Sequence, residues 1–100
     1  MNYDRYIPLI NNYWFRGIPD YERWFRKSNN FDKEIKTMFY GILKVGEAGL
    51  IEHWGSTKDG FMAYIILLDQ FSRQIYRNNR KSYKNDAQSM KFMRTHIMKY

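Results

Sequence analysis

The 100-residue chain contains no cysteine, and this absence removes several kinds of chemistry at once. Disulfide bonds, thiolate catalysis and cysteine-based zinc sites all require a residue that the chain does not have. Long apolar runs are missing too: the longest, Ala63–Leu68, has six residues, whereas a membrane-spanning helix needs about 20. The first residues also lack the apolar core of a signal peptide. We therefore expect no membrane partner and a cytoplasmic location.

Short motifs of catalytic and cofactor-binding sites are absent as well. The sequence has no glycine-rich phosphate loop, no His-Glu-x-x-His pair and no nucleophile elbow, and Gly46 and Gly49 are typical of a helix end. His53 and His96 each lack a second metal ligand at helical spacing. We therefore expect no metal and no cofactor, and we assign no catalytic residue.

Acidic residues are scarce in the last third of the chain, and this makes the protein basic. Residues 1–69 carry nine Lys or Arg and nine Asp or Glu, whereas residues 70–100 carry eight basic residues and one acidic residue, Asp86. The net charge of +7 therefore arises from the last third. Such a segment is either a contact surface for nucleic acid, an acidic protein or an anionic lipid, or a solvated helix face without a partner. The second interpretation is the more common one for bare charge.

Aromatic and aliphatic residues are abundant and follow helical spacing. Nineteen aromatic residues in a chain that is 44% hydrophobic predict a folded unit, and 100 residues suffice for one domain, 1–100. Apolar residues at intervals of three and four predict helices over 7–15, over 31–45 and from near Thr57 to 77. A last helix is expected from about Tyr83 or Asn85 onward, with an apolar stripe of Ala87, Met90, Met93 and Ile97. We therefore expect an all-α fold with about four main helices, arranged as antiparallel hairpins.

The most suggestive cluster lies on the expected central helix, between Tyr64 and Arg77. Asp69, Arg73 and Arg77 follow one another at intervals of four, so they form one column on a helix. The simplest interpretation is an ion pair of Asp69 with Arg73, and the alternative is a ligand site in which Arg77 takes a carboxylate or phosphate. The tryptophans are more typical of a core or a pocket wall than of a ligand platform. The candidate ligand-binding residues are Asp69, Gln70, Arg73, Arg77, Trp14 and Trp24.

Short segments spread over nearly the whole chain carry a family resemblance. The most specific is the run Ile66-Leu67-Leu68-Asp69-Gln70-Phe71-Ser72-Arg73. The others are Tyr13-Trp14-Phe15, Trp24-Phe25-x-Lys27, Phe31-Asp32-x-x-Ile35, Trp54, Ile75-Tyr76-Arg77 and Asp86-Ala87. Together they resemble the N-terminal half of the DUF924 family of uncharacterised proteins.

The resemblance implies an all-α, tetratricopeptide-like arrangement of antiparallel helices and no particular activity. It also implies that family members are roughly twice as long, so the second half would be absent from this chain. A site built from both halves would then be incomplete. Exposed apolar surface would in that case favour self-association into a homo-oligomer or pairing with a complementing second chain.

Three functions are compatible with these observations. The first is a helical protein-interaction module whose concave face holds a peptide or a partner helix. The second is nucleic-acid or anion binding through the basic C-terminal third, with Arg73, Arg77, Arg80, Lys81 and Lys84 as the contacts. The third is a small-molecule binder or an unrecognised enzyme centred on Asp69 and Arg73. The sequence favours the first function, with a protein or peptide as partner, and places the second next.

Overall fold

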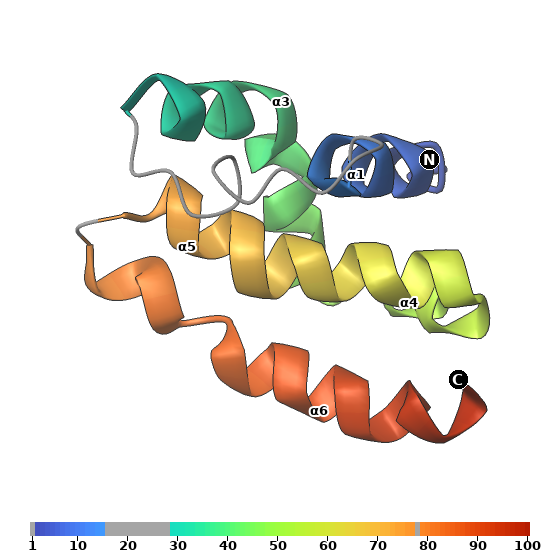
Figure 1. The fold of residues 1–100 in the computed structure, drawn as a ribbon. Helices are drawn as coiled ribbons and strands as arrows, with labels where there is room; N and C mark the ends of the chain where they lie inside the picture. Colours follow the sequence, from blue (N-terminus) through green and yellow to red (C-terminus); the bar gives the residue numbers. More distant parts are fainter. Residues whose placement is uncertain (1, 16–28, 78) are drawn as a thin grey trace.

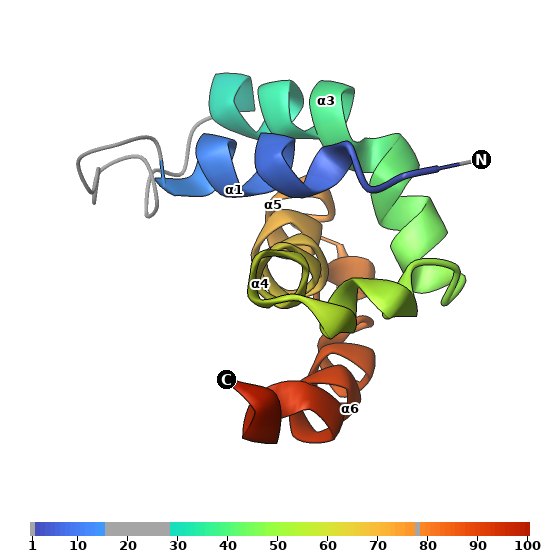
Figure 2. The ribbon, with the colours of Figure 1, turned by 90° about the vertical axis from the view of Figure 1, so that its right-hand side faces the viewer.

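The helices stack in three layers around a central helix (Figure 1 and Figure 2). The computed structural model describes residues 2–15, 29–77 and 79–100. Its α-helices are α1 (Tyr6–Phe15), α3 (Asn29–Glu47), α4 (Lys58–Ile65), α5 (Ser72–Ile75) and α6 (Asp86–His96), and no strand occurs among the described residues. In Figure 1, α1 and α3 lie above, α4 and α5 form the middle layer, and α6 lies below. The expected all-α class is confirmed.

Neighbouring helices run in opposite directions. Figure 2 shows α1 running against the first half of α3, and Figure 1 shows α6 running against α4 and α5. Turns of 3₁₀-helix at Glu52–Ser56 and Arg80–Tyr83 lie on the connections before α4 and before α6. Such short connections bring successive helices back side by side. None of the helices in the described part of the chain is long and apolar enough to span a bilayer.

The central helix is continuous from α4 to α5 but changes geometry in its middle. It begins after Thr57, whose side-chain oxygen accepts a hydrogen bond from the backbone N–H of Gly60 at 3.0 Å. This confirms the expected start near Thr57. The segment Ile66–Phe71 is π-helical and joins α4 to α5. Such segments are rare and often occur at functional sites, and this one contains Asp69 and Gln70.

An aromatic cluster fills the space between the central helix and the upper layer. Phe71 is fully buried and stacks on Phe39 of α3 with a ring-centroid distance of 4.7 Å. Its ring also meets Tyr13 and Trp14 of α1 edge-on at 5.9 Å and 6.0 Å. Because large aromatic rings remove much apolar surface from water, this cluster holds α1 and α3 onto the central helix.

The outer helix α6 packs through one aromatic residue and leaves its apolar stripe in solvent. Phe92 stacks on Tyr64 of α4 with a ring-centroid distance of 3.9 Å, and Ser89 is buried beside it. The expected stripe of Ala87, Met90, Met93 and Ile97 exists, but all four residues are exposed. The stripe therefore does not contribute to the core; it forms the outer face of α6.

Candidate functional site

The charged cluster predicted on the central helix is present and includes a residue from α6. One guanidinium nitrogen of Arg73, Nη2, lies 3.3 Å from Asp69 Oδ1, so the predicted ion pair forms. The same nitrogen lies 3.1 Å from Oδ2 of Asp86, the first residue of α6. Arg73 also lies over the ring of Tyr83 at 5.3 Å from its centroid. Two carboxylates therefore share one cation. The ion pair of Arg73 with Asp86 joins the middle layer to the lower layer.

A cleft of about 200 Å³ opens beside this cluster, between the central helix and α6. We call it the charged cleft. Oδ1 of Asp86 is buried and has no hydrogen-bond partner within the described part of the chain, although Oδ2 is held by Arg73. One part of the wall is thus charged and the other part is formed by methionine side chains. The lining residues are Asp69, Arg73, Asp86, Ser89, Met90 and Met93.

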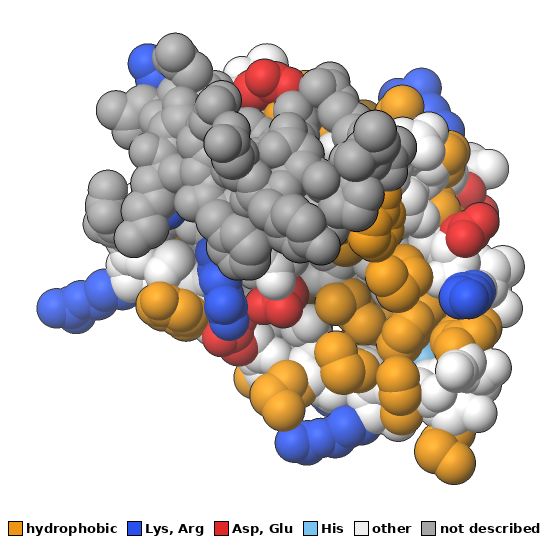
Figure 3. Space-filling view, in the orientation of Figure 1, with side chains coloured by type: hydrophobic (Ala, Val, Ile, Leu, Met, Phe, Trp, Pro, Cys, Tyr) orange, Lys and Arg blue, Asp and Glu red, His pale blue; other side chains and the backbone are white. Residues whose placement is uncertain are grey.

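Hydrophobic side chains gather on the same side of the molecule. Figure 3 shows them over α6 and the adjoining part of the middle layer, next to the charged residues. Met90 is 52% exposed, Met93 37% and Ile97 46%. We call these three residues the outer stripe. Because Met90 and Met93 also line the charged cleft, the stripe and the cleft form one continuous surface.

The other predicted ligand-binding residues divide into two groups. Gln70 belongs to the cluster, because its side-chain amide donates to Asp69 Oδ2 at 3.3 Å. Trp14 does not line the charged cleft; it packs on the core residue Phe71. Arg77 is partly buried just beyond α5 and is also outside the cleft lining. Trp24 lies outside the described residues.

The basic residues proposed as nucleic-acid contacts are not all available for phosphate. Arg73 is shared by two aspartates, and the amine of Lys84 lies 3.4 Å from Glu47 Oε2. Arg80 and Lys81 are exposed on the turn before α6. Within the described ranges, no three His, Asp or Glu side chains lie close enough together to hold a metal ion.

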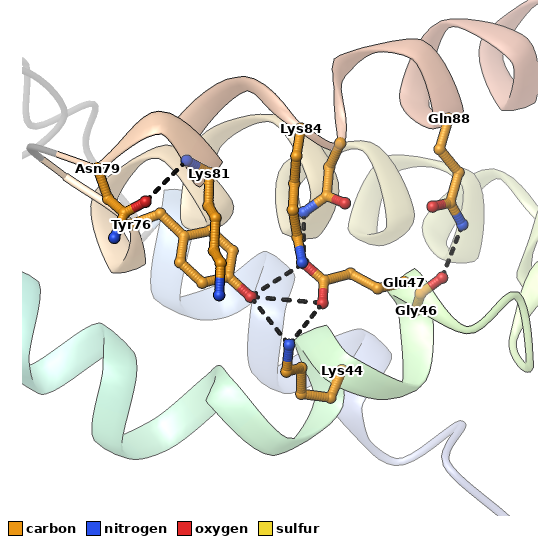
Figure 4. Close-up of polar contacts among 9 residues, drawn as sticks. Lys44, Gly46, Glu47, Tyr76, Asn79, Lys81, Lys84 and Gln88 are labelled. Atoms are coloured by element: carbon orange, nitrogen blue, oxygen red, sulfur yellow. Dashed lines mark hydrogen bonds and ion pairs between the residues drawn. The ribbon is translucent and has the colours of Figure 1, made fainter.

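A second polar cluster surrounds Glu47 at the end of α3, and the sequence did not reveal it (Figure 4). The Glu47 side chain is only 11% exposed. Its Oε2 accepts hydrogen bonds from the Asn85 amide at 2.7 Å and from the Tyr76 hydroxyl at 3.0 Å. Its Oε1 lies 3.2 Å from the amine of Lys44. With Lys84, these residues form the Glu47 network, which connects α3 to the end of α5 and to the start of α6.

The network changes the proton affinity of its members. Burial alone would raise the pKa of the Glu47 carboxyl, but hydrogen bonds from Asn85, Lys44 and Tyr76 outweigh burial and hold the pKa below its usual value. Burial, followed by the neighbouring Glu47 carboxylate, raises the pKa of Tyr76. Hydrogen bonds to Glu47 and Tyr76 raise the pKa of Lys44. All three shifts favour a charged Glu47 and Lys44 beside a neutral Tyr76 at neutral pH.

Only part of the Glu47 network had a sequence signal. Lys44 and Glu47 are three residues apart on one predicted helix, so their contact could have been inferred. Tyr76 and Asn85 lie 29 and 38 residues away from Glu47, and no local pattern links them to it. Asp86, which pairs with Arg73 in the charged cleft, did stand out in the sequence, because it is the only acidic residue in positions 70–100.

Comparisons with known proteins give one match. The model of the family described as "Bacterial protein of unknown function (DUF924)" matches residues 10–100. No curated protein matches, and no solved structure matches. The matched range includes the charged cleft, the outer stripe and the Glu47 network. The chain therefore belongs to the DUF924 family.

Proposed function

We propose that this chain is a helical protein-interaction module that binds a partner helix along the outward face of α6. The observation that carries the proposal is the outer stripe, in which Met90, Met93 and Ile97 are all substantially exposed. Exposed apolar residues that stand singly need no explanation, but a row beside a cleft is typical of an interaction site.

The spacing of the outer stripe supports a helical partner. Its residues follow one another at intervals of three and four, so they form one column along α6. A column of this kind matches the apolar face of an amphipathic helix, which presents anchors at the same spacing. Methionine side chains are flexible and polarisable and therefore adapt well to a partner surface. The charged cleft would close one side of this contact.

The position of α6 in the stack also supports the proposal. It is one of the two outer layers in Figure 1, and it rests on the middle layer through Phe92. Tetratricopeptide-like proteins hold peptides on a concave face, whereas the contact proposed here lies on the outward face of α6. The cytoplasmic location stays a prediction from the sequence.

The two other hypotheses stay predictions. Two of the contacts proposed for nucleic-acid binding, Arg73 and Lys84, already form ion pairs with carboxylates of the chain, which weakens that hypothesis. A small-molecule site centred on Asp69 and Arg73 draws support from the charged cleft and from the π-helical segment that carries Asp69. A cleft of about 200 Å³ is smaller than most sites that enclose a drug-sized ligand, about 300–1,000 Å³.

The proposal predicts that the double variant Met90→Ser, Met93→Ser loses partner binding while it stays folded. The probe is a set of fluorescein-labelled amphipathic helical peptides with leucine at every third and fourth position, measured by fluorescence anisotropy. We expect binding to weaken by about tenfold or more, because apolar anchors carry most of the affinity at such interfaces. Circular dichroism during thermal unfolding checks that both proteins fold alike.

Met38→Ser is the matched control, since Met38 is 47% exposed on α3, away from the outer stripe. This variant should bind the peptides as the unmodified chain does. Peptides that fail to bind the unmodified chain, or that bind all three proteins equally, would contradict the proposed function.

A further inference from the structure

We infer that the partner helix is acidic along one edge, an inference that rests on the proposed function and names the chemistry of the partner. The outer stripe is an apolar column with different charges on its two sides. A partner that docks on this column must place its own flanking residues against those charges.

The first side of the outer stripe is basic. Arg94 lies three residues after Lys91 and four residues after Met90. The two cations are therefore neighbours on the surface of α6, beside Met90. Both side chains are exposed. Within residues 2–15, 29–77 and 79–100, neither forms an ion pair. Lys91 shares a small cavity of about 100 Å³ with Glu52, whereas Arg94 lines neither this cavity nor the charged cleft.

The second side of the outer stripe is the charged cleft, whose described lining has two carboxylates, Asp69 and Asp86, and one cation, Arg73. Asp69 and Asp86 share the guanidinium of Arg73, and Oδ1 of Asp86 has no hydrogen-bond partner among the residues that the structure describes. A nucleic acid or an anionic membrane is negative throughout and would bring phosphates against these aspartates as well as against the cations. A helix can carry acids on one edge alone, so its charge pattern can match both sides.

A second copy of this chain that packs antiparallel on the outer stripe is a poorer match than an acidic helix. If two α6 helices packed antiparallel about a twofold axis through the outer stripe, Lys91 and Arg94 of one copy would face the same cations of the other. The net charge of +7 adds a general repulsion between copies. The net charge and the cations on the basic side thus favour a partner helix with acidic residues over an antiparallel second copy.

Three peptides with one leucine stripe and different edges test the inference. One edge carries glutamate, one glutamine and one lysine, and binding to the full chain is measured by fluorescence anisotropy at several salt concentrations. The glutamate peptide should bind about tenfold more tightly than the glutamine peptide, because two charge pairs of modest strength form at a partly desolvated interface. The lysine peptide should bind most weakly.

Charge reversal at the basic side should reverse this order. In the variant Lys91→Glu, Arg94→Glu the lysine peptide should bind best, and the milder Arg94→Gln should reduce the preference for glutamate. The control variant Lys33→Glu, Lys58→Glu changes the net charge equally at exposed sites on α3 and α4 and should keep the original order.

The outcomes separate the inference from the proposed function. Equal binding of the glutamate and glutamine peptides, still lost in Met90→Ser, Met93→Ser, overturns the acidic edge and leaves the interaction module intact. Absence of binding by all three peptides overturns both. Tighter binding of a labelled single-stranded RNA or of phosphatidylserine vesicles, lost in Lys91→Glu, Arg94→Glu, overturns the inference in favour of that partner. A dimer seen by light scattering that Met93→Ser dissociates overturns it in favour of a second copy.

Discussion

Replacing Phe71 with alanine is expected to lower the free energy of unfolding by about 4 kcal/mol, the largest effect of any single change considered for this chain. Phe71 is fully buried and contacts residues of α1 and α3. Its ring contacts Phe39, Tyr13 and Trp14 at centroid distances of 4.7, 5.9 and 6.0 Å. Truncation would remove these contacts and leave a cavity that three helices can fill only by moving together.

A loss of this size is large for a domain of 100 residues, whose total stability is about 5–15 kcal/mol. Urea unfolding followed by circular dichroism measures the change. Phe15→Ala is the matched control, because Phe15 is exposed at the end of α1, and its loss should cost less than about 1 kcal/mol. Equal destabilisation by the two variants would mean that Phe71 is not part of a packed core.

Replacing Glu47 with alanine is expected to destabilise the fold by about 3 kcal/mol. The carboxylate is only 11% exposed and accepts hydrogen bonds from Asn85 and Tyr76, both of which are buried. Without it, the Asn85 amide loses its acceptor, and the amines of Lys44 and Lys84 lose their counter-charge. Because the network joins α3 to the start of α6, we expect α6 to loosen first. Hydrogen exchange of the α6 amides would detect that loosening.

The variant Glu47→Gln separates the charge from the hydrogen bonds, because it keeps the size and one acceptor oxygen. The folded-state pKa of Glu47 lies below its ordinary value of 4.5. Its charge therefore stabilises the fold fully above pH 4.5, and this contribution is lost as the pH falls through the lower folded-state pKa. The stability difference between the unmodified chain and Glu47→Gln should shrink over that range. A difference that stays constant down to acid pH would show that the charge does not matter.

Local sequence patterns predicted the helices well because each carries its own signals. The helix that was expected over 7–15 spans Tyr6–Phe15 in the structure, and the helix that was expected over 31–45 spans Asn29–Glu47. The central helix was expected to begin near Thr57, and Thr57 is its N-cap. The π-helical segment Ile66–Phe71 had no such signal, because a widened turn depends on how neighbouring helices pack.

The candidate site was predictable only where its residues share one helix. The ion pair of Asp69 with Arg73 follows from their spacing of four residues. The contribution of Asp86 and the whole connection from Glu47 to Asn85 depend on how α6 docks, which no local spacing specifies. The same holds for the side of α6 that faces inward, where Phe92 occupies the core contact and the methionines remain outside.

If the outward face of α6 is a docking surface, the methyl signals of its methionines must respond when a peptide binds. The chain has six methionines, of which Met90 and Met93 lie in α6 and Met38 lies in α3. Nuclear magnetic resonance of methyl-labelled protein, with signals assigned through the serine variants, follows each methionine as the glutamate-edged peptide is added. We expect saturable shifts for Met90 and Met93 and none for Met38. Unchanged signals of Met90 and Met93, or a shift of Met38 of the same size, would contradict a docking surface on α6.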